Sequence, residues 1–245
     1  MRVMIVIPAR MDSTRFPGKP LVDLMGKPMV QWVFEAARKS AYAEEVVVAT
    51  PDPVIVDRCQ EFGCKALLTR SDHLTGTDRI AEVASQVESE VYVNVQGDEP
   101  LIPTASIDAC VAPLLERADA QMASVHCDCE PAEIDNPMVV KVVTDNSGRA
   151  LYFSRHAIPY PRNPRTIPVK KHVGLYAFRR QALLEFASLP PSPLEIAESL
   201  EQLRFLENGI GIQMSPAQGT ELAVDTPEQA EQVRRILELR SSSRV

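Results

Sequence analysis

Short apolar runs alternate with amphipathic segments over the first half of the chain. The runs read as strands are Val3–Ile7, Glu45–Thr50, Ala66–Leu68 and Val91–Val95. The segments with helical periodicity are Met29–Lys39, Pro53 to about Phe62, Asp78–Val87 and Thr104 to about Arg117. Strands and helices that alternate at this spacing build βαβ units. We therefore expect an α/β fold with a mainly parallel sheet covered by helices on both faces.

The rhythm changes after a fifth apolar run, Met122–Cys127. Two apolar segments, Val139–Thr144 and Ala150–Ser154, flank the turn sequence "DNSG" and predict a β-hairpin. The loop over 155–171 is rich in Pro, Arg and Lys and is long enough to be functional or interfacial. We predict one domain over 1–245, with an inserted hairpin region at about 130–190.

Two helices of the C-terminal part begin with a capping motif. "SPLE" at Ser192 and "TPEQ" at Thr226 each place a hydroxyl residue at the N-cap, Pro next, and Glu or Gln three residues on. The predicted helices run from Ser192 to about Glu207 and from Thr226 to about Leu239. A strand over His172–Phe178 precedes them.

Charge and composition exclude two classes of partner. The net charge of the 245 residues is −7, so no overall basic field attracts nucleic acid. No apolar run approaches the ~20 residues that span a bilayer. The opening apolar run is also too short for a secretory leader, and we expect a cytoplasmic protein without membrane or nucleic-acid partners.

The five cysteines are an odd number and are scattered, which predicts reduced thiols. The sequence "HCDCE" at 126–130 has the residue types of a zinc site. It offers at most three close ligands, however, and the strand-end interpretation is favoured over zinc.

Polar clusters follow several of the predicted strands. They are Arg10–Lys19 after the first, "TGTDR" (Thr75–Arg79) after the third, "QGDEP" (Gln96–Pro100) after the fourth, and Asp225 in "AVDTP" after a late strand. Ligands of open parallel sheets bind beyond the carboxyl ends of the strands. These clusters therefore predict a site at one edge of the sheet.

The first cluster has the chemistry of a phosphate-binding loop. Arg10, Arg15 and Lys19, with the hydroxyl of Ser13 and the loop amides, suit a chain of phosphates. The loop matches neither the P-loop pattern nor the dinucleotide fingerprint. The alternative is a solvated basic loop, which the rigid "PGKP" disfavours.

The carboxylates point to a divalent metal. Asp98 ends an apolar strand, and Asp225 returns to the same edge from the late strand. Hard oxygen ligands beside a polyphosphate are typical of Mg²⁺, which takes one or two carboxylates together with phosphate oxygens. The alternative for either residue is a helix cap. The backbone and hydroxyl groups of "TGTDR" suit hydrogen bonds to the edge of a nucleotide base. The alternative is that Thr77 or Asp78 caps the next helix, and the two roles are compatible.

With these pieces in order, the chain resembles the 3-deoxy-manno-octulosonate (Kdo) cytidylyltransferases. The matching stretches span residues 5–230: "IPARMDSTRFPGKPL", "TGTDR", "VNVQGDEPLI", "NPMVVKVV", "LYFSR", "KHVGLYAF", "SPLEIAESLEQLRFLENG" and "VDTPE". The resemblance implies a three-layer, Rossmann-like nucleotidyltransferase fold. It also implies a reaction in which the anomeric hydroxyl of a Kdo-type sugar attacks the α-phosphorus of CTP, with Mg²⁺ as cofactor and a homodimer formed through the hairpin region.

The family's functional residues carry over to matching positions of this chain. The nucleotide-binding positions are Ala9, Arg10, Ser13, Arg15, Lys19, Thr75, Asp78 and Arg79. The catalytic positions are Lys19, Arg10, Asp98 and Asp225, the last two also holding Mg²⁺. The sugar-binding positions are Gln96, Arg155, His172, Tyr176, Glu201 and Gln202.

Alternatives remain for the sugar side. His172 and Tyr176 share a face of their strand, which suits a pocket or a packed sheet surface. Glu201 and Arg204 are spaced as a helix surface pair. Departures from the family pattern, such as His156 and Ala223, leave open an 8-amino analogue of Kdo, with a sialic-acid-type sugar as a weaker rival. A glycosyltransferase is disfavoured because the DxD metal motif expected after the fourth strand is absent. A non-catalytic nucleotide-sugar binder is disfavoured because it would not need Lys19 and both aspartates, which are all present.

Overall fold

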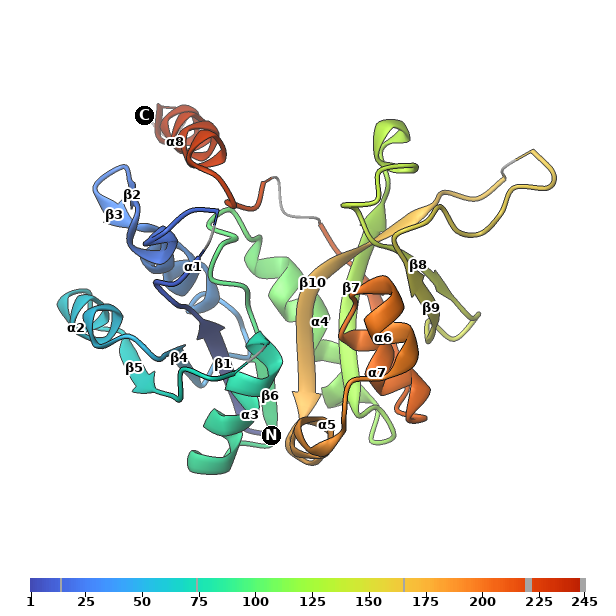
Figure 1. Cartoon of the computed structure of the whole chain (residues 1–245), viewed down its shortest axis with the longest axis horizontal. Helices are drawn as coiled ribbons and strands as arrows, with labels where there is room; N and C mark the ends of the chain where they lie inside the picture. The colour runs from blue at the N-terminus through green and yellow to red at the C-terminus, as the bar shows by residue number, and fades with distance from the viewer. Residues whose placement is uncertain (14, 74, 165, 219–221, 243–245) are drawn as a thin grey trace.

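A computed structural model describes residues 1–13, 15–73, 75–164, 166–218 and 222–242. Its main element is a nine-stranded sheet in the order β11-β7-β10-β6-β1-β4-β5, with β8 beside β10 and β9 beside β8 (Figure 1). The strands are β1 Val3–Pro8, β4 Glu45–Thr50, β5 Lys65–Leu68, β6 Val91–Asn94, β7 Met122–Asp128, β8 Lys141–Thr144, β9 Ala150–Ser154, β10 Lys170–Arg179 and β11 Ile212–Pro216. A short ribbon pairs β2 Asp23–Leu24 with β3 Lys27–Pro28.

The N-terminal half of the sheet is parallel, as the sequence predicts. β1 pairs in parallel with both β4 and β6, and β4 pairs in parallel with β5. β10 lies antiparallel to β6 and β7, so the direction reverses where the hairpin region joins the sheet. The carboxyl ends of β1, β4 and β6 therefore share one edge.

Helices cover both faces of the sheet, which confirms the three-layer α/β fold. The helices are α1 Met29–Ala37, α2 Pro53–Glu61, α3 Gly76–Gln86, α4 Thr104–Glu116, α5 Arg180–Ser188, α6 Pro193–Glu198, α7 Gln202–Glu207 and α8 Pro227–Ser242, with the 3-10 turns η1 Lys19–Leu21 and η2 Pro131–Glu133. α1, α2 and α4 bury Val33, Ile55 and Ile107 against one face. On the other face, α3 contributes Ile80 and α5 contributes Phe186.

α8 packs on the ribbon side of the molecule rather than on the main sheet. Val224, Val233 and Leu237 bury their side chains with Leu24 and Met29. The backbone N–H of Val224 also donates to the carbonyl of Asp98 at 2.8 Å. This pairing, and not a strand, returns Asp225 to the edge of the sheet. The expectation that Asp225 directly follows a strand is wrong, because β11 ends at Pro216.

The helix expected from Ser192 to about Glu207 is two helices. α6 ends at Glu198, and the next residue, Ser199, caps it with a left-handed backbone at φ of 52°. The capping motif at Ser192 is present, as is the one at Thr226, where Gln229 Oε1 accepts from the Thr226 N–H at 3.0 Å. The break redirects the chain so that Glu201 reaches the hydroxyl of Thr77 on α3. α5 was not predicted.

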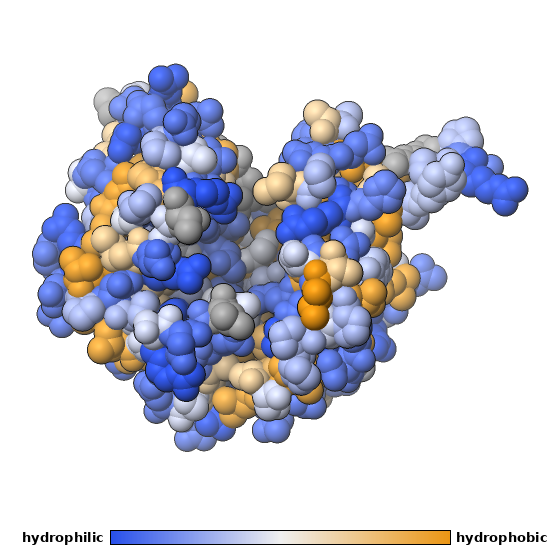
Figure 2. Space-filling view, viewed as in Figure 1, coloured by the Kyte–Doolittle hydropathy of each residue, from blue (hydrophilic) through white to orange (hydrophobic). Residues whose placement is uncertain are grey.

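The hairpin β8–β9 is antiparallel, as expected, and the segment between β9 and β10 extends away from the body of the molecule (Figure 1). Figure 2 shows the surface hollowed between the part that carries α1 and α8 and the part that carries β8 and β9. Among the described residues, no helix is long and apolar enough to cross a membrane.

Candidate active site

A pocket of about 360 Å³ opens beyond the carboxyl ends of β1 and β6. Four segments that are far apart in the sequence supply most of its lining, and these are the polar clusters noted above. The lining residues are Pro8, Ala9, Arg10, Asp12, Ser13, Arg15, Lys19, Pro20, Met29, His73, Thr75, Gly76, Arg79, Gln96, Gly97, Asp98 and Asp225. The structure thus brings together most of the predicted nucleotide and metal residues.

The loop after β1 is held in shape by contacts of its own backbone. The N–H of Met11 donates to Asp52 Oδ2 at 2.7 Å, and the N–H of Gly18 donates back to the Met11 carbonyl at 3.0 Å. Gly18 has φ of 73°, a left-handed conformation that favours glycine, and it turns the chain into η1. Lys19 therefore enters the pocket from a constrained turn, as "PGKP" predicts.

Lys19 joins the two aspartates of the site. Its Nζ lies 2.7 Å from Asp98 Oδ2 and 3.0 Å from Asp225 Oδ1, and Arg15 contacts the other Asp225 oxygen at 3.1 Å. Burial alone lowers the pKa of Lys19, but the charges and hydrogen bonds of Asp98 and Asp225 outweigh it and raise the pKa above the usual value. The ammonium group is therefore charged and tightly held.

The same geometry fits a hard cation. One nitrogen can contact both Asp98 and Asp225 only if their oxygens converge on a common point. Two convergent carboxylates beside a phosphate-binding loop are a donor set that suits Mg²⁺. No group of three or more His, Cys, Asp or Glu residues stands ready for a metal in the described part of the chain. The "HCDCE" stretch runs over the end of β7, as expected.

The turn after β6 is packed closely against β1. A Cβ atom on Gly97 would lie 2.7 Å from the carbonyl oxygen of Pro8, so only glycine fits there. Glu99 is buried beside Asp98, and burial together with the Asp98 charge raises the pKa of Glu99 to about 8.

The "TGTDR" segment begins α3. Thr75 and Asp78 form a reciprocal capping box, in which Thr75 Oγ1 accepts from the Asp78 N–H at 3.1 Å. The Asp78 carboxylate is therefore engaged in capping, the alternative named for it, while Thr75 and Arg79 line the pocket. The Arg79 guanidinium donates to the Arg70 carbonyl at 2.9 Å and to Thr69. Burial and the Arg10 charge lower the pKa of Arg79 from its usual value.

Four of the predicted sugar residues, His172, Tyr176, Glu201 and Gln202, form a second, largely buried cluster. The rings of His172 and Tyr176 lie 5.3 Å apart, so they do share a face. Tyr176 Oη contacts Gln202 Oε1 at 3.4 Å, and Glu201 accepts a hydrogen bond from Thr77. Burial raises the pKa of Glu201 and lowers that of His172 to about 3. The cluster is therefore polar in composition and short of charge.

Two buried amide groups of this region lack a partner among the described residues. They are Nδ2 of Asn94, at the end of β6, and Nε2 of Gln202, whose residue is 2% exposed. Orphaned buried donors cost free energy unless something else satisfies them. Each is a hydrogen-bond donor that an acceptor on a bound ligand could satisfy.

Arg155 takes a structural position at the edge of this region. Its guanidinium donates to the carbonyls of Glu198 at 2.8 Å, Pro137 at 3.1 Å and Ser199 at 3.3 Å. The side chain thus joins the hairpin region to the break between α6 and α7. The alternative that Glu201 and Arg204 form a surface pair is wrong, because Arg204 is buried and its Nε donates to Glu195 at 2.6 Å.

The comparisons with known proteins agree with this geometry. A sequence model of the family described as cytidylyltransferase matches residues 4–214. The 3-deoxy-manno-octulosonate cytidylyltransferase of Solibacter usitatus is 48% identical over 96% of this chain and 94% of its own length. That of Pseudomonas fluorescens is 50% identical over 96% of this chain and 97% of its own length. The chain belongs to this family. It is a nucleotidyltransferase.

Comparison with solved structures agrees with this family assignment at the level of the fold. A structure of CMP:2-keto-3-deoxy-manno-octonic acid synthetase complexed with CTP superimposes with a TM-score of 0.95 at 44% identity, over 98% of this chain and all of that chain. A 4-diphosphocytidyl-2C-methyl-D-erythritol synthase from Anaerococcus prevotii, at 11% identity and a TM-score of 0.65, shares the fold alone. The expected nucleotidyltransferase fold is confirmed.

The sequence interpretation missed several residues of the pocket wall. Asp12 and His73 both line it, and Glu99 is buried beside it. His73 immediately precedes "LTGTDR", so its place after the third strand was a signal that could have found it. Nothing in the local sequence distinguishes a buried Glu99 from an exposed one.

Proposed function

We propose that this protein transfers CMP from CTP to the anomeric hydroxyl of 3-deoxy-manno-octulosonate, giving CMP-Kdo and pyrophosphate for lipopolysaccharide synthesis. The observation that carries the proposal is the convergence of Lys19, Asp98 and Asp225 in a pocket that Arg10 and Arg15 also line. The relatives' names support Kdo as the sugar and do not favour the 8-amino or sialic-acid alternatives.

Each loop residue has a role in this proposal. Arg10, Ser13 and Arg15 bind the triphosphate, and Lys19 neutralises charge that develops at the α-phosphorus. The anomeric hydroxyl oxygen forms a bond to the α-phosphorus, and the bond from that phosphorus to the oxygen bridging to the β-phosphate breaks, so pyrophosphate leaves. The hydroxyl proton passes to solvent. Because Lys19 and Arg15 are paired with carboxylates, the phosphates have to replace those partners.

We propose that Asp98 and Asp225 hold Mg²⁺. The bound ion supplies charge neutralisation at the phosphates and acidifies the attacking hydroxyl. Gln96 and Gln202 contribute amide groups to the sugar, and Tyr176 and His172 form the wall against which its carbon chain packs. Arg155 at the hairpin side and Glu201 at the start of α7, beside Thr77 of α3, complete the proposed sugar set.

The test is pyrophosphate release with CTP and Mg²⁺, run in parallel on Kdo, 8-amino-Kdo and N-acetylneuraminate. We expect release with Kdo at the highest kcat/KM. Preference for 8-amino-Kdo would revise the sugar, and silence with all three from folded protein would overturn the reaction. Omission of Mg²⁺ with a chelator should stop release, and unchanged turnover would remove the metal from the proposal.

We also propose a homodimer that forms through the hairpin region. This region exposes large apolar side chains, including Tyr160 at 84%, Met138 at 72% and Ile167 at 64%. Light scattering should give twice the monomer mass, and a monomer at micromolar concentration would contradict this. A cytoplasmic location is proposed because the reaction consumes CTP, and cell fractionation tests it.

A further inference from the structure

His73 lines the pocket but has no role in the proposed function. It lies between β5 and α3, beside Thr75 and Gly76 in the pocket wall, and its side chain is 11% exposed. This wall differs from the one that carries Lys19 and the aspartates. Apart from Arg79, whose guanidinium is already bonded to Thr69 and to the Arg70 carbonyl, its lining groups are neutral.

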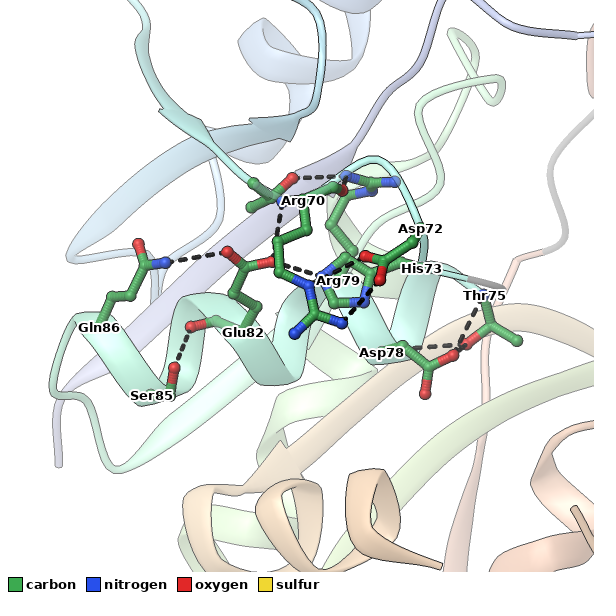
Figure 3. Close-up of polar contacts among 10 residues, drawn as sticks. Arg70, Asp72, His73, Thr75, Asp78, Arg79, Glu82, Ser85 and Gln86 are labelled. Carbon is green, nitrogen blue, oxygen red and sulfur yellow. Dashed lines mark hydrogen bonds and ion pairs between the residues drawn. The ribbon is translucent and has the colours of Figure 1, made fainter. Parts of the chain in front are cut away.

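Glu82 on α3 determines how the His73 ring is oriented. Figure 3 shows its carboxylate between His73, the backbone of Arg70 and the side chain of Gln86. Burial alone raises the pKa of Glu82, but the hydrogen bonds from His73 and the Arg70 N–H outweigh it and lower the pKa below the usual value. Glu82 is therefore an ionised carboxylate, which can only accept hydrogen bonds.

It follows that His73 Nε2 carries a proton and donates a hydrogen bond to Glu82. In the neutral ring the second nitrogen, Nδ1, is then a hydrogen-bond acceptor. Nδ1 has no hydrogen-bond partner within the part of the chain that the structure describes. The Arg70 N–H and Gln86 Nε2 each donate to the Glu82 carboxylate at 3.0 Å. The carboxylate that orients the His73 ring is therefore itself fixed by two further hydrogen bonds.

We propose that His73 is a further nucleotide-contacting residue, which presents Nδ1 as an acceptor to an N–H or O–H donor on the nucleoside half of CTP. The proposal rests on CTP being the substrate. A triphosphate offers only acceptors at neutral pH, so an acceptor in the pocket wall suits the nucleoside. The donors available there are the 4-amino group of cytosine and the ribose hydroxyls. Glu82 acts as a positioning residue for His73.

The experiment measures nucleotide affinity by calorimetry in the absence of sugar. His73→Phe keeps a flat ring without nitrogen and should weaken CTP binding about tenfold, the effect of one hydrogen bond. His73→Asn retains a polar atom near the Nδ1 position and should recover part of the loss. Glu82→Gln should weaken CTP binding less than His73→Phe, because the ring remains but its orientation is no longer fixed.

Three analogues identify the donor. UTP lacks the 4-amino group, while 2′-deoxy-CTP and 3′-deoxy-CTP each lack one ribose hydroxyl. The analogue without the relevant donor should bind the wild type about tenfold more weakly than CTP and should not respond to His73→Phe. Ser85→Ala is the matched control, because it removes a hydrogen bond to the backbone carbonyl of Glu82 and leaves the Glu82 carboxylate and His73 in place. It should bind CTP like the wild type.

Two results would overturn the inference. One is unchanged CTP affinity in His73→Phe while the wild type binds CTP and releases pyrophosphate, which leaves the proposed function intact. The other is an equal loss for CTP and all three analogues, which assigns His73 a purely structural role. A wild type that does not bind CTP removes the proposed function and this inference together. Steady-state kinetics should show the change in KM for CTP with kcat changed less than about threefold.

Discussion

The two halves of the candidate site differ in how their charged and polar groups are neutralised and buried. At the phosphate half, Lys19 is 14% exposed and its partners Asp98 and Asp225 are 31% and 34% exposed, so opposite charges neutralise one another beside solvent. At the proposed sugar half, Tyr176 and Gln202 are almost fully buried, and the polar groups are neutral or pushed toward neutrality. One half is ion-paired beside solvent, whereas the other is buried and short of charge.

This difference indicates how each ligand is selected. Ion pairs near solvent are worth little and can be exchanged for phosphates or a cation at small cost. Buried amides cannot be resolvated by water in the same way, so a sugar that leaves them unpaired is strongly disfavoured. Charge should therefore control rate at the phosphate half, and hydrogen-bond matching should control sugar choice at the other.

The largest effect is expected at the two aspartates. Asp98→Asn and Asp225→Asn should each reduce kcat by roughly a thousandfold or more, because the proposed Mg²⁺ would lose a charged ligand. Pyrophosphate release measures the loss, and circular dichroism with thermal melting confirms the fold. If both variants keep activity, the metal assignment is wrong.

Lys19 should affect turnover more than binding. In Lys19→Ala we expect kcat to fall about a hundredfold while the Kd of CTP changes less than about fivefold, since the charge acts mainly on the transition state. Calorimetry and steady-state kinetics separate the two quantities. Equal losses in both would show that Lys19 binds ground and transition states alike.

Lys19 should also compete with free metal for the aspartates. In Lys19→Met the carboxylates lose their ammonium partner, so Mn²⁺ should bind the nucleotide-free protein roughly tenfold more tightly than it binds the wild type. Electron paramagnetic resonance of free Mn²⁺ measures this affinity in the absence of turnover. Asp98→Asn is the control and should bind less, and identical affinity in Lys19→Met and wild type would argue against competition.

Gln202 should affect the sugar more than the fold. Gln202→Leu removes the unpartnered Nε2 but also takes the Oε1 acceptor from the buried Tyr176 hydroxyl, so Tm should fall slightly while the KM for the sugar rises about tenfold. Gln202→Glu keeps an acceptor for Tyr176 but not the amide donor, and should show the same rise in KM. A normal sugar KM in both variants would place Gln202 outside the sugar site.

The smallest effect is an acid dependence of stability. The pKa of His172 is lowered to about 3 by burial and by His126 nearby, and that of His126 is lowered to about 4, also by burial first. Both are below the value of about 6.5 in the unfolded chain, so the unfolded state takes up protons first. The stabilisation is complete above pH 6.5 and declines as pH falls toward 4 and 3, by at most about 1.4 kcal/mol per pH unit for each histidine.

Urea unfolding at pH 7, 6 and 5 measures this slope. His172→Gln cannot take up a proton, so its unfolding free energy should fall less steeply over that range. Parallel slopes for variant and wild type would mean that His172 is already protonated in the fold.

Much of the fold could be predicted because it depends on local patterns. The apolar runs of β1, β4 and β6 are buried strands, and the capping motifs at Ser192 and Thr226 start helices where expected. The break between α6 and α7 could not be predicted, because it depends on a left-handed Ser199 and on tertiary partners for Glu201 and Arg204. Helical periodicity alone continues through that point.

The sequence by itself determined which segments carry the chemistry. Arg15, Lys19, Asp98 and Asp225 are polar residues in or beside buried apolar elements, a placement that local patterns reveal. Only the tertiary structure decided their partners, because a separation of 206 residues between Lys19 and Asp225 carries no local signal. The pairing of His73 with Glu82 was also decided by the tertiary structure, because it forms only once α3 packs against the loop that follows β5.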